Sequence, residues 1–209
     1  DLSALKIEFV TVTAEDRFKA ITEKKADILC EATTATLSRR EQLDFSIPTF
    51  VSGAGLIIRD GGPGDFKALA GKKIGVLGGT TTEQALRNSL SEQKITAEVI
   101  PAKTHDEGLA SLESGGTDAY FADRTILRYR LEHRKSPARL LLSENYLTVE
   151  PYALGVPLGE TSFRLAVDRA LSKLYRTGAI VKIFREVFGE KAKPTGLQKA
   201  LYTISGLSE

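Results

Sequence analysis

The amino-acid sequence predicts an α/β protein with mostly parallel sheets, because short runs rich in β-branched residues alternate with amphipathic helical segments. The expected strands cover residues 6–12, 28–30, 53–59, 73–77, 98–100, 119–121 and 152–156. The expected helices cover residues 14–23, 82–91, 106–114, 123–132, 162–177 and 179–188. Two of these helices follow a capping-box pattern, Thr80 before Glu83 and Thr104 before Glu107.

The boundaries of several elements are marked by particular residues. The run 28–30 is apolar and ends in Cys30, which is typical of a buried strand. The run 73–77 leads directly into two glycines, and the run 119–121 lies between Asp118 and Asp123. Residues 60–64, Asp-Gly-Gly-Pro-Gly, are typical of a turn and are the nearest thing to a linker.

Composition and charge exclude several classes of function. The chain has 209 residues, 42% of them hydrophobic, and a formal net charge of +2, so neither sign of charge dominates. The sequence contains no long run of basic residues, which is the pattern that would indicate nucleic-acid binding. Uninterrupted apolar stretches stay well below the ~20 residues that a membrane span needs, so we expect no direct membrane insertion.

Cysteine and histidine usage predicts neither a disulfide nor a metal site. Cys30 is the only cysteine, so an internal disulfide is impossible. His105 and His133 lie far apart in the sequence, and neither has a Cys or His at ligand spacing. We expect no metal, no cofactor and no catalytic residue.

A hydroxyl-rich segment with one guanidinium, residues 33–48, follows the strand expected at 28–30. The planar donor fork of Arg39 matches the two oxygens of a carboxylate, and nearby hydroxyl and backbone N–H groups can satisfy the remaining lone pairs. This favours a carboxylate-binding site. The alternative is a helix N-terminus capped by Thr36, with Arg39 in solvent.

A second candidate is the turn Gly78-Gly79-Thr80-Thr81 between the strand 73–77 and the following helix. Glycines let a ligand approach the backbone, and the N–H groups at a helix N-terminus favour an anion. The turn is not a phosphate-binding P-loop, because no Gly-Lys-Ser/Thr follows at the required interval. The alternative role is simple helix capping by Thr80.

A third candidate is Asp123, which ends the apolar run after Asp118. Open α/β sheets bind ligands at the carboxyl ends of their strands, and a carboxylate there can hold an ammonium group. The alternative is that Asp123 caps the next helix. Together with Arg39 and the turn at Thr80, Asp123 supplies the complement of a zwitterion.

These residues resemble a family signature. In the amino-acid-binding periplasmic solute-binding proteins of ABC importers, a Thr-rich strand end precedes an Arg and then an Asp-Phe-Ser-x-Pro turn, here Arg39 and residues 44–48. The resemblance implies a two-lobed type II periplasmic binding protein fold. Lobe 1 would comprise residues 1–52 and 150–209, lobe 2 residues 53–149, and the two crossovers would form a hinge. The family's first strand and helix are not present, so lobe 1 is expected to be incomplete.

The resemblance also implies ligand contacts. Thr34 and a backbone carbonyl near Ala32 would help Asp123 to hold the α-amino group, while Thr80 and Thr81 would close on the carboxylate. The sequence is most similar to the glutamate/aspartate-binding branch, in which a His at the position of His105 meets an acidic side chain. A neighbouring carboxylate would raise the pKa of that imidazole. Ala32 replaces a small hydroxyl residue of that branch.

The implied function is extracytoplasmic binding of a free polar or acidic amino acid, such as glutamate or aspartate, for delivery to a membrane-embedded ABC permease. The implied location is the periplasm. Two alternatives remain open on the same fold. One is a cyclohexadienyl dehydratase-like enzyme, with Glu150 or His105 as its acid or base. The other is the ligand-binding module of a receptor.

Overall fold

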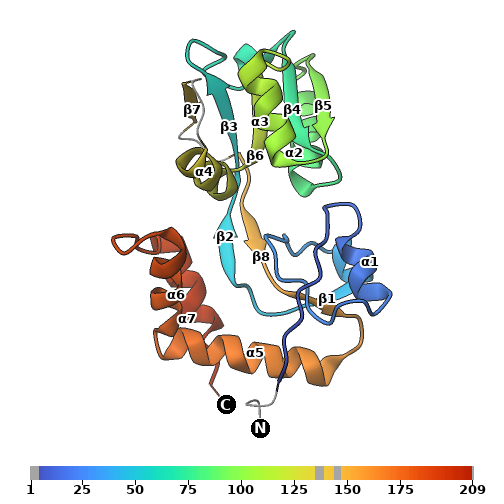
Figure 1. Cartoon of the computed structure of the whole chain (residues 1–209), viewed down its shortest axis with the longest axis vertical. Coiled ribbons are helices and arrows are strands. Elements are labelled where there is room, and N and C mark those ends of the chain that lie inside the picture. The colour runs from blue at the N-terminus through green and yellow to red at the C-terminus, as the bar shows by residue number, and fades with distance from the viewer. Residues whose placement is uncertain (1–4, 135–138, 144–146, 209) are drawn as a thin grey trace. The chain divides into compact units, whose positions relative to one another are not determined.

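The computed structural model describes residues 5–134, 139–143 and 147–208, which belong to two compact units (Figure 1). Unit 1 comprises Asp1–Phe50 and Tyr152–Glu209, and unit 2 comprises Val51–Pro151. The chain passes between them through β2 (Phe50–Ser52) and β8 (Glu150–Tyr152), which pair with each other. Both boundaries lie two residues from those expected from the sequence.

Unit 2 contains a five-stranded sheet in the order β5-β4-β6-β3-β7. Its strands are β3 (Ala54–Arg59), β4 (Lys73–Leu77), β5 (Glu98–Ala102), β6 (Ala119–Asp123) and β7 (Leu140–Leu142). β4 is parallel to β5 and β6, whereas β3 is antiparallel to β6 and β7. The expectation of a mostly parallel sheet is therefore wrong for this unit. The pattern of a single strand shows how it is buried but not the direction of its neighbour.

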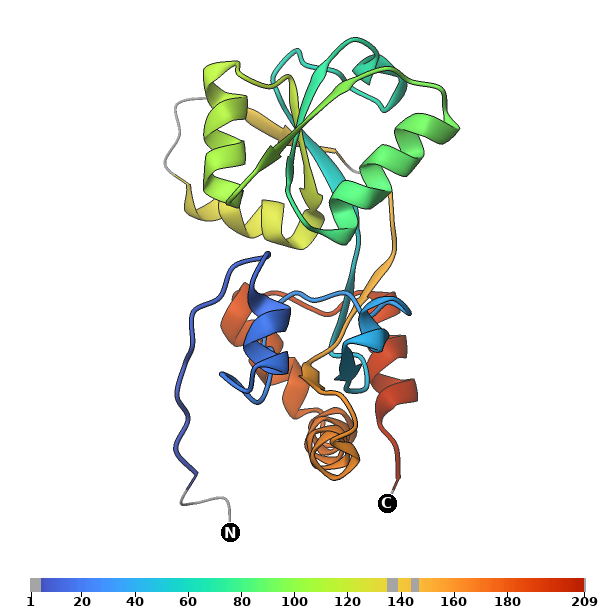
Figure 2. The ribbon, with the colours of Figure 1, turned by 90° about the vertical axis from the view of Figure 1, so that its right-hand side faces the viewer.

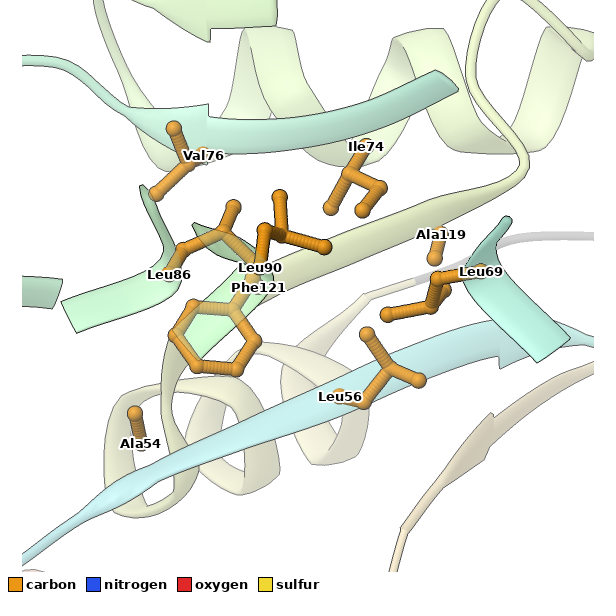
Figure 3. Close-up of a cluster of buried hydrophobic side chains, with 9 residues drawn as sticks. All are labelled: Ala54, Leu56, Leu69, Ile74, Val76, Leu86, Leu90, Ala119 and Phe121. Carbon is orange, nitrogen blue, oxygen red and sulfur yellow. The ribbon is translucent and has the colours of Figure 1, made fainter. Parts of the chain in front are cut away.

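Helices cover both faces of this sheet (Figure 2). Side chains of α2 (Thr81–Glu92) and η3 (Lys67–Leu69) pack on one face, together with alternate residues of β6 such as Phe121. Figure 3 shows this cluster, which comprises Ala54, Leu56, Leu69, Ile74, Val76, Leu86, Leu90, Ala119 and Phe121. The other face packs Tyr120 and Ala122 against α3 (His105–Ser114) and α4 (Arg124–His133). This two-residue alternation is what a strand covered on both sides requires.

Unit 1 is mainly helical around one short antiparallel pair. Its strands are β1 (Leu43–Phe45) and β9 (Gly155–Pro157), and its helical elements are α1 (Arg17–Thr22), η2 (Arg39–Glu41), α5 (Thr161–Arg176), α6 (Ala179–Phe188) and α7 (Gly196–Ser205). The pair contributes Leu43 and Phe45 to a small buried cluster with Ile21 and Leu29. Since this sheet is antiparallel, the expectation of a mostly parallel sheet is wrong here too.

Three expectations for unit 1 need correction. Residues 6–12 form no strand, and Ile7 and Phe9 are 72% and 94% exposed. The run 28–30 contributes only one bridge, between Leu29 and Gly155. The run 152–156 is divided between β8 and β9, and α7 was not expected. A strand needs a hydrogen-bonding neighbour, and an alternating pattern does not show whether one is present.

Over the part of the chain that the structure describes, no helix combines the length and apolar character that a membrane crossing requires.

Candidate functional site

The predicted site residues of unit 2 follow strands that end at one edge of its sheet. β4, β5 and β6 are parallel neighbours, so their carboxyl ends meet at that edge. Thr80 and Thr81 follow β4, His105 follows β5, and Asp123 is the last residue of β6. β3 begins at the same edge, because Ala54 is the partner of Asp123. The fold thus gathers these residues at the edge where α/β sheets bind ligands.

Asp123 is a buried helix cap. Its Oδ1 accepts hydrogen bonds from Thr125 N at 2.8 Å and from Ile126 N at 2.9 Å, and the residue is 5% exposed. The capping alternative for Asp123 is therefore confirmed. An ionised carboxylate carries the charge that attracts an ammonium group and only accepts hydrogen bonds. The ligand-binding role stays a prediction.

Thr80 is also a cap. Its hydroxyl accepts from Glu83 N at 3.2 Å and donates to Leu77 O at 2.8 Å, so its single hydrogen is used within the turn. Glu83 does not complete the expected capping box, because its carboxylate accepts from Gly79 N at 3.0 Å. Any anion binding at this turn would therefore depend on backbone N–H groups and not on the Thr80 hydroxyl.

Thr81 is tied to a buried carboxylate that the sequence reasoning did not place among the ligand-binding residues. Its hydroxyl donates to Glu150 Oε2 at 3.0 Å, and the Thr148 hydroxyl donates to Glu150 Oε1 at 2.9 Å. Thr148 in turn accepts from Ala54 N at 2.7 Å, and Glu150 is only 6% exposed. The position of Glu150 beside a crossover was visible in the sequence, but its contact with Thr81 depends on tertiary structure.

The His105 side chain makes a hydrogen bond within unit 2. Its Nδ1 lies 3.0 Å from the Tyr120 hydroxyl, and Tyr120 is fully buried. Burial, assisted by the positive charge of Arg130, lowers the pKa of the His105 imidazole to about 4, although Asp106 acts in the opposite direction. This shift is opposite to the one expected beside a ligand carboxylate. The ligand-binding role of His105 stays a prediction.

In unit 1, Arg39 is anchored by neighbouring groups and is only partly exposed. Its Nη1 donates to Thr34 O at 2.8 Å, and its Cζ lies 5.2 Å from the centre of the Phe18 ring. Its backbone N–H donates to the Thr36 hydroxyl at 3.2 Å, but the short helix η2 begins after Ser38 and not after Thr36. The helix-capping alternative also left the Arg39 side chain in solvent, and that part is wrong. Ala32 is exposed nearby in sequence.

Sequence reasoning missed an ion pair beside this guanidinium. Arg17, 5% exposed, pairs with Glu31, which also accepts from the Thr33 hydroxyl at 2.8 Å. The Arg17 Cζ lies 4.9 Å from the centre of the Phe18 ring, the ring that Arg39 also contacts. No spacing rule links positions 17 and 31, so only the fold shows this pair.

Among the described residues, no group of three or more His, Cys, Asp and Glu side chains is arranged to hold a metal ion.

The fold is that of the type II periplasmic binding proteins. A solved structure described as an ancestral arginine-binding protein bound to glutamine superposes with a TM-score of 0.78 at 26% sequence identity. The superposition covers 88% of this chain and 81% of that one. Residues 1–190 match the family described as bacterial extracellular solute-binding proteins, family 3, and the chain belongs to this family.

Two curated proteins that are similar to this chain are both named for glutamate and aspartate. The L-glutamate/L-aspartate-binding protein of Pseudomonas aeruginosa is 30% identical over 198 residues, which are 94% of this chain and 66% of that protein. The glutamate/aspartate import solute-binding protein of Salmonella typhimurium is 28% identical over 194 residues, 92% of this chain and 64% of that protein. The chain thus spans just under two thirds of the length of these relatives.

Proposed function

We propose that this chain binds a free amino acid outside the cytoplasm, in the periplasm, and delivers it to a membrane-embedded ABC permease. The observation that carries the proposal is the division of charge between the predicted site residues. Unit 1 supplies the anchored guanidinium of Arg39, and unit 2 supplies the buried carboxylate of Asp123. A cation and an anion together complement the two charges of a zwitterion.

Each charge of the ligand is assigned to named groups. Arg39 makes a bidentate contact with the α-carboxylate, supported by backbone N–H groups of the turn that leads into α2. Asp123 accepts from the α-ammonium, supported by the Thr34 hydroxyl and a backbone carbonyl near Ala32. The family membership and the burial of the Asp123 carboxylate support these assignments.

An acidic amino acid is the proposed ligand, because both curated relatives are named for glutamate and aspartate. His105 would contact the ligand side chain as a neutral donor, since its pKa of about 4 keeps the ring uncharged at neutral pH. If the Tyr120 hydroxyl donates to Nδ1, the ring hydrogen lies on Nε2, which can donate to a carboxylate.

The test is a calorimetric titration of the chain with each common amino acid, together with a turnover assay on prephenate and arogenate. We expect saturable binding of L-glutamate or L-aspartate and no turnover. Arg39→Ala is the matched variant that should lose the binding. A folded protein that binds no amino acid would contradict the proposal, and turnover would favour the dehydratase-like alternative.

A further inference from the structure

An ion pair in unit 1 lies next to both groups that contact the Arg39 side chain. We infer that this pair, Arg17 with Glu31, positions the Arg39 guanidinium for the ligand carboxylate, so that Arg17 and Glu31 are positioning residues. The inference rests on the proposed function, because it concerns how the same amino acid is bound. It gives a role to an ion pair that has no meaning in the sequence alone.

The first step is the burial of Arg17. This residue begins α1 and is 5% exposed, so its charge needs a compensating partner. Among the described residues, Glu31 is the only acceptor of the Arg17 guanidinium, whose Nε is buried without a hydrogen-bond partner. Glu31 therefore determines where this buried guanidinium can lie.

The second step connects Glu31 to the carbonyl that binds Arg39. The Glu31 oxygen that pairs with Arg17 also accepts from the Thr33 hydroxyl at 2.8 Å. Thr33 is fully buried, and the next residue, Thr34, supplies the carbonyl that accepts from Arg39 Nη1 at 2.8 Å. Because adjacent Cα atoms are ~3.8 Å apart, a shift of Thr33 moves that carbonyl with it.

The third step connects Arg17 to the ring that contacts Arg39. Phe18 follows Arg17 in α1, and the two guanidinium groups share its ring: Arg17 Cζ lies 4.9 Å and Arg39 Cζ 5.2 Å from the ring centre. Both distances are within the ~6 Å over which a cation interacts with an aromatic ring. The Thr34 carbonyl and the Phe18 ring thus each adjoin a residue that the ion pair holds in place.

The experiment is a double-mutant cycle on L-glutamate affinity, measured by calorimetry for the wild type, Glu31→Ala, Arg39→Ala and the double variant. We expect Glu31→Ala to weaken binding about three- to tenfold, within the range of coupling between residues of one ion-pair network. In the Arg39→Ala background the same change should alter affinity less than about twofold, because Glu31 acts through Arg39. If Arg39→Ala binds too weakly for calorimetry, Phe18→Leu is the second background, and the combined loss should be smaller than the product of the single losses.

Glu31→Gln separates the position of Arg39 from the charge of Glu31. The Gln side chain keeps an oxygen that can accept from Arg17 and Thr33, so we expect an affinity within about twofold of the wild type. Glu23→Ala is the matched control, since Glu23 pairs with Lys25 at 2.6 Å on the surface of the same unit. It removes the same charge from unit 1 and should leave the affinity unchanged.

Thermal unfolding of each ligand-free variant separates folding defects from binding defects. If Glu31→Ala does not fold, Arg17→Leu combined with Glu31→Ala takes its place in the cycle. Removing both charges leaves no buried charge without a partner, while the link between α1 and Thr33 is still lost.

Two failures are distinguishable. If the wild type binds L-glutamate but Glu31→Ala keeps full affinity, weakens binding equally in both backgrounds or binds no more weakly than Glu31→Gln, the inference is overturned and the proposed function stands. If the folded wild type binds no amino acid, the proposed function is overturned and the inference with it.

Discussion

The two units differ in how many strands each one pairs and in how well each one buries its apolar side chains. Unit 2 pairs five strands in one sheet and covers both faces with helices. The described residues of unit 1 form one two-stranded sheet within that unit, β1 with β9, and Phe9 and Ile204 are 94% and 76% exposed. Alternating apolar patterns are present in both units. The difference shows that such a pattern becomes a strand only where the fold supplies a neighbouring strand.

The units also differ in how their candidate ligand groups are held. In unit 2, Asp123 is oriented by the first turn of α4, a contact between residues close in sequence. In unit 1, Arg39 combines a local bond to Thr34 O with a tertiary contact to Phe18 on α1. We therefore expect the carboxylate to tolerate distant changes better than the guanidinium.

The largest expected effect is at Arg39. Arg39→Ala should weaken amino-acid binding at least tenfold, because removing one partner of a buried charged contact costs about 2–5 kcal/mol. Arg39→Lys should not restore the affinity, since an ammonium lacks the planar donor fork. Arg40→Ala is the control, because the Arg40 Cζ lies over Phe45 instead. Calorimetry in which Arg40→Ala proves more damaging would refute the assignment.

The pH dependence of stability should report on unit 2, because neither histidine lies in unit 1. The His105 pKa of about 4 in the folded protein lies below the unfolded value of about 6.5, so the unfolded state takes up the proton first. Stability from this group is present above pH about 6.5 and falls, by up to about 3 kcal/mol, as the pH decreases to about 4.

Denaturant unfolding of the wild type and His105→Gln across that pH range tests this expectation. The variant should show a shallower decline than the wild type. His133→Gln, which changes an exposed histidine of the same unit, should leave the decline unchanged. Identical curves for the wild type and His105→Gln would contradict the buried, neutral state.

Two glycine substitutions compare the packing of the units directly. A Cβ at Gly108 on α3 would lie 2.1 Å from Tyr120 Cε2, a distance that the buried ring would have to relieve by moving. Gly108→Ala should therefore destabilise by about 1–3 kcal/mol, although alanine is the better helix former. In unit 1, a Cβ at Gly196 meets nothing within 4 Å. Gly196→Ala should be neutral or slightly stabilising, and equal effects in thermal unfolding would contradict this contrast.

The smallest effect is expected at Phe18. Phe18→Leu keeps an apolar side chain but removes the ring beneath Arg39, so ligand affinity should fall roughly two- to fivefold, as for an exposed cation–π contact. Phe18→Tyr keeps the ring and should bind like the wild type. A calorimetric comparison in which both variants bind equally would remove Phe18 from the account of how Arg39 is oriented.

Much of unit 2 could be predicted from the sequence. The strand at 73–77 is observed with the expected bounds. The observed bounds of α2, α3 and α4 differ from the expected ones by at most one residue at each end. These elements have strong local signals, such as the caps at Thr80 and Thr104. The direction of β3 could not be predicted, because pairing direction depends on how the chain enters the sheet.

Single residues could be selected from the sequence as candidates for the site, whereas contacts between two distant residues could not be foreseen. Arg39 and Asp123 stand out by residue type and position. The bond between Thr81 and Glu150 joins residues 69 positions apart, and the pair of Arg17 with Glu31 joins residues 14 apart. Neither spacing has a meaning before the strands are placed.

The most direct test of the division of charge compares two ligands on one variant. Asp123→Asn keeps the ability to cap α4, since Asn caps helices as well as Asp, but it loses the charge. L-glutamate carries an ammonium group, and glutarate has the same carboxylates without it. The measurement is the affinity of the wild type and of Asp123→Asn for both ligands by calorimetry, with Asp118→Asn as the charge control.

If unit 2 holds the ammonium, Asp123→Asn should weaken L-glutamate binding at least tenfold, in keeping with a cost of about 2–5 kcal/mol for breaking a buried charged contact. Glutarate binding should be unchanged or stronger, because a repelling carboxylate has been removed. An equal loss for both ligands, with unfolding temperatures unchanged, would contradict the assignment of Asp123 to the ammonium group and with it the proposed division of charge between the units.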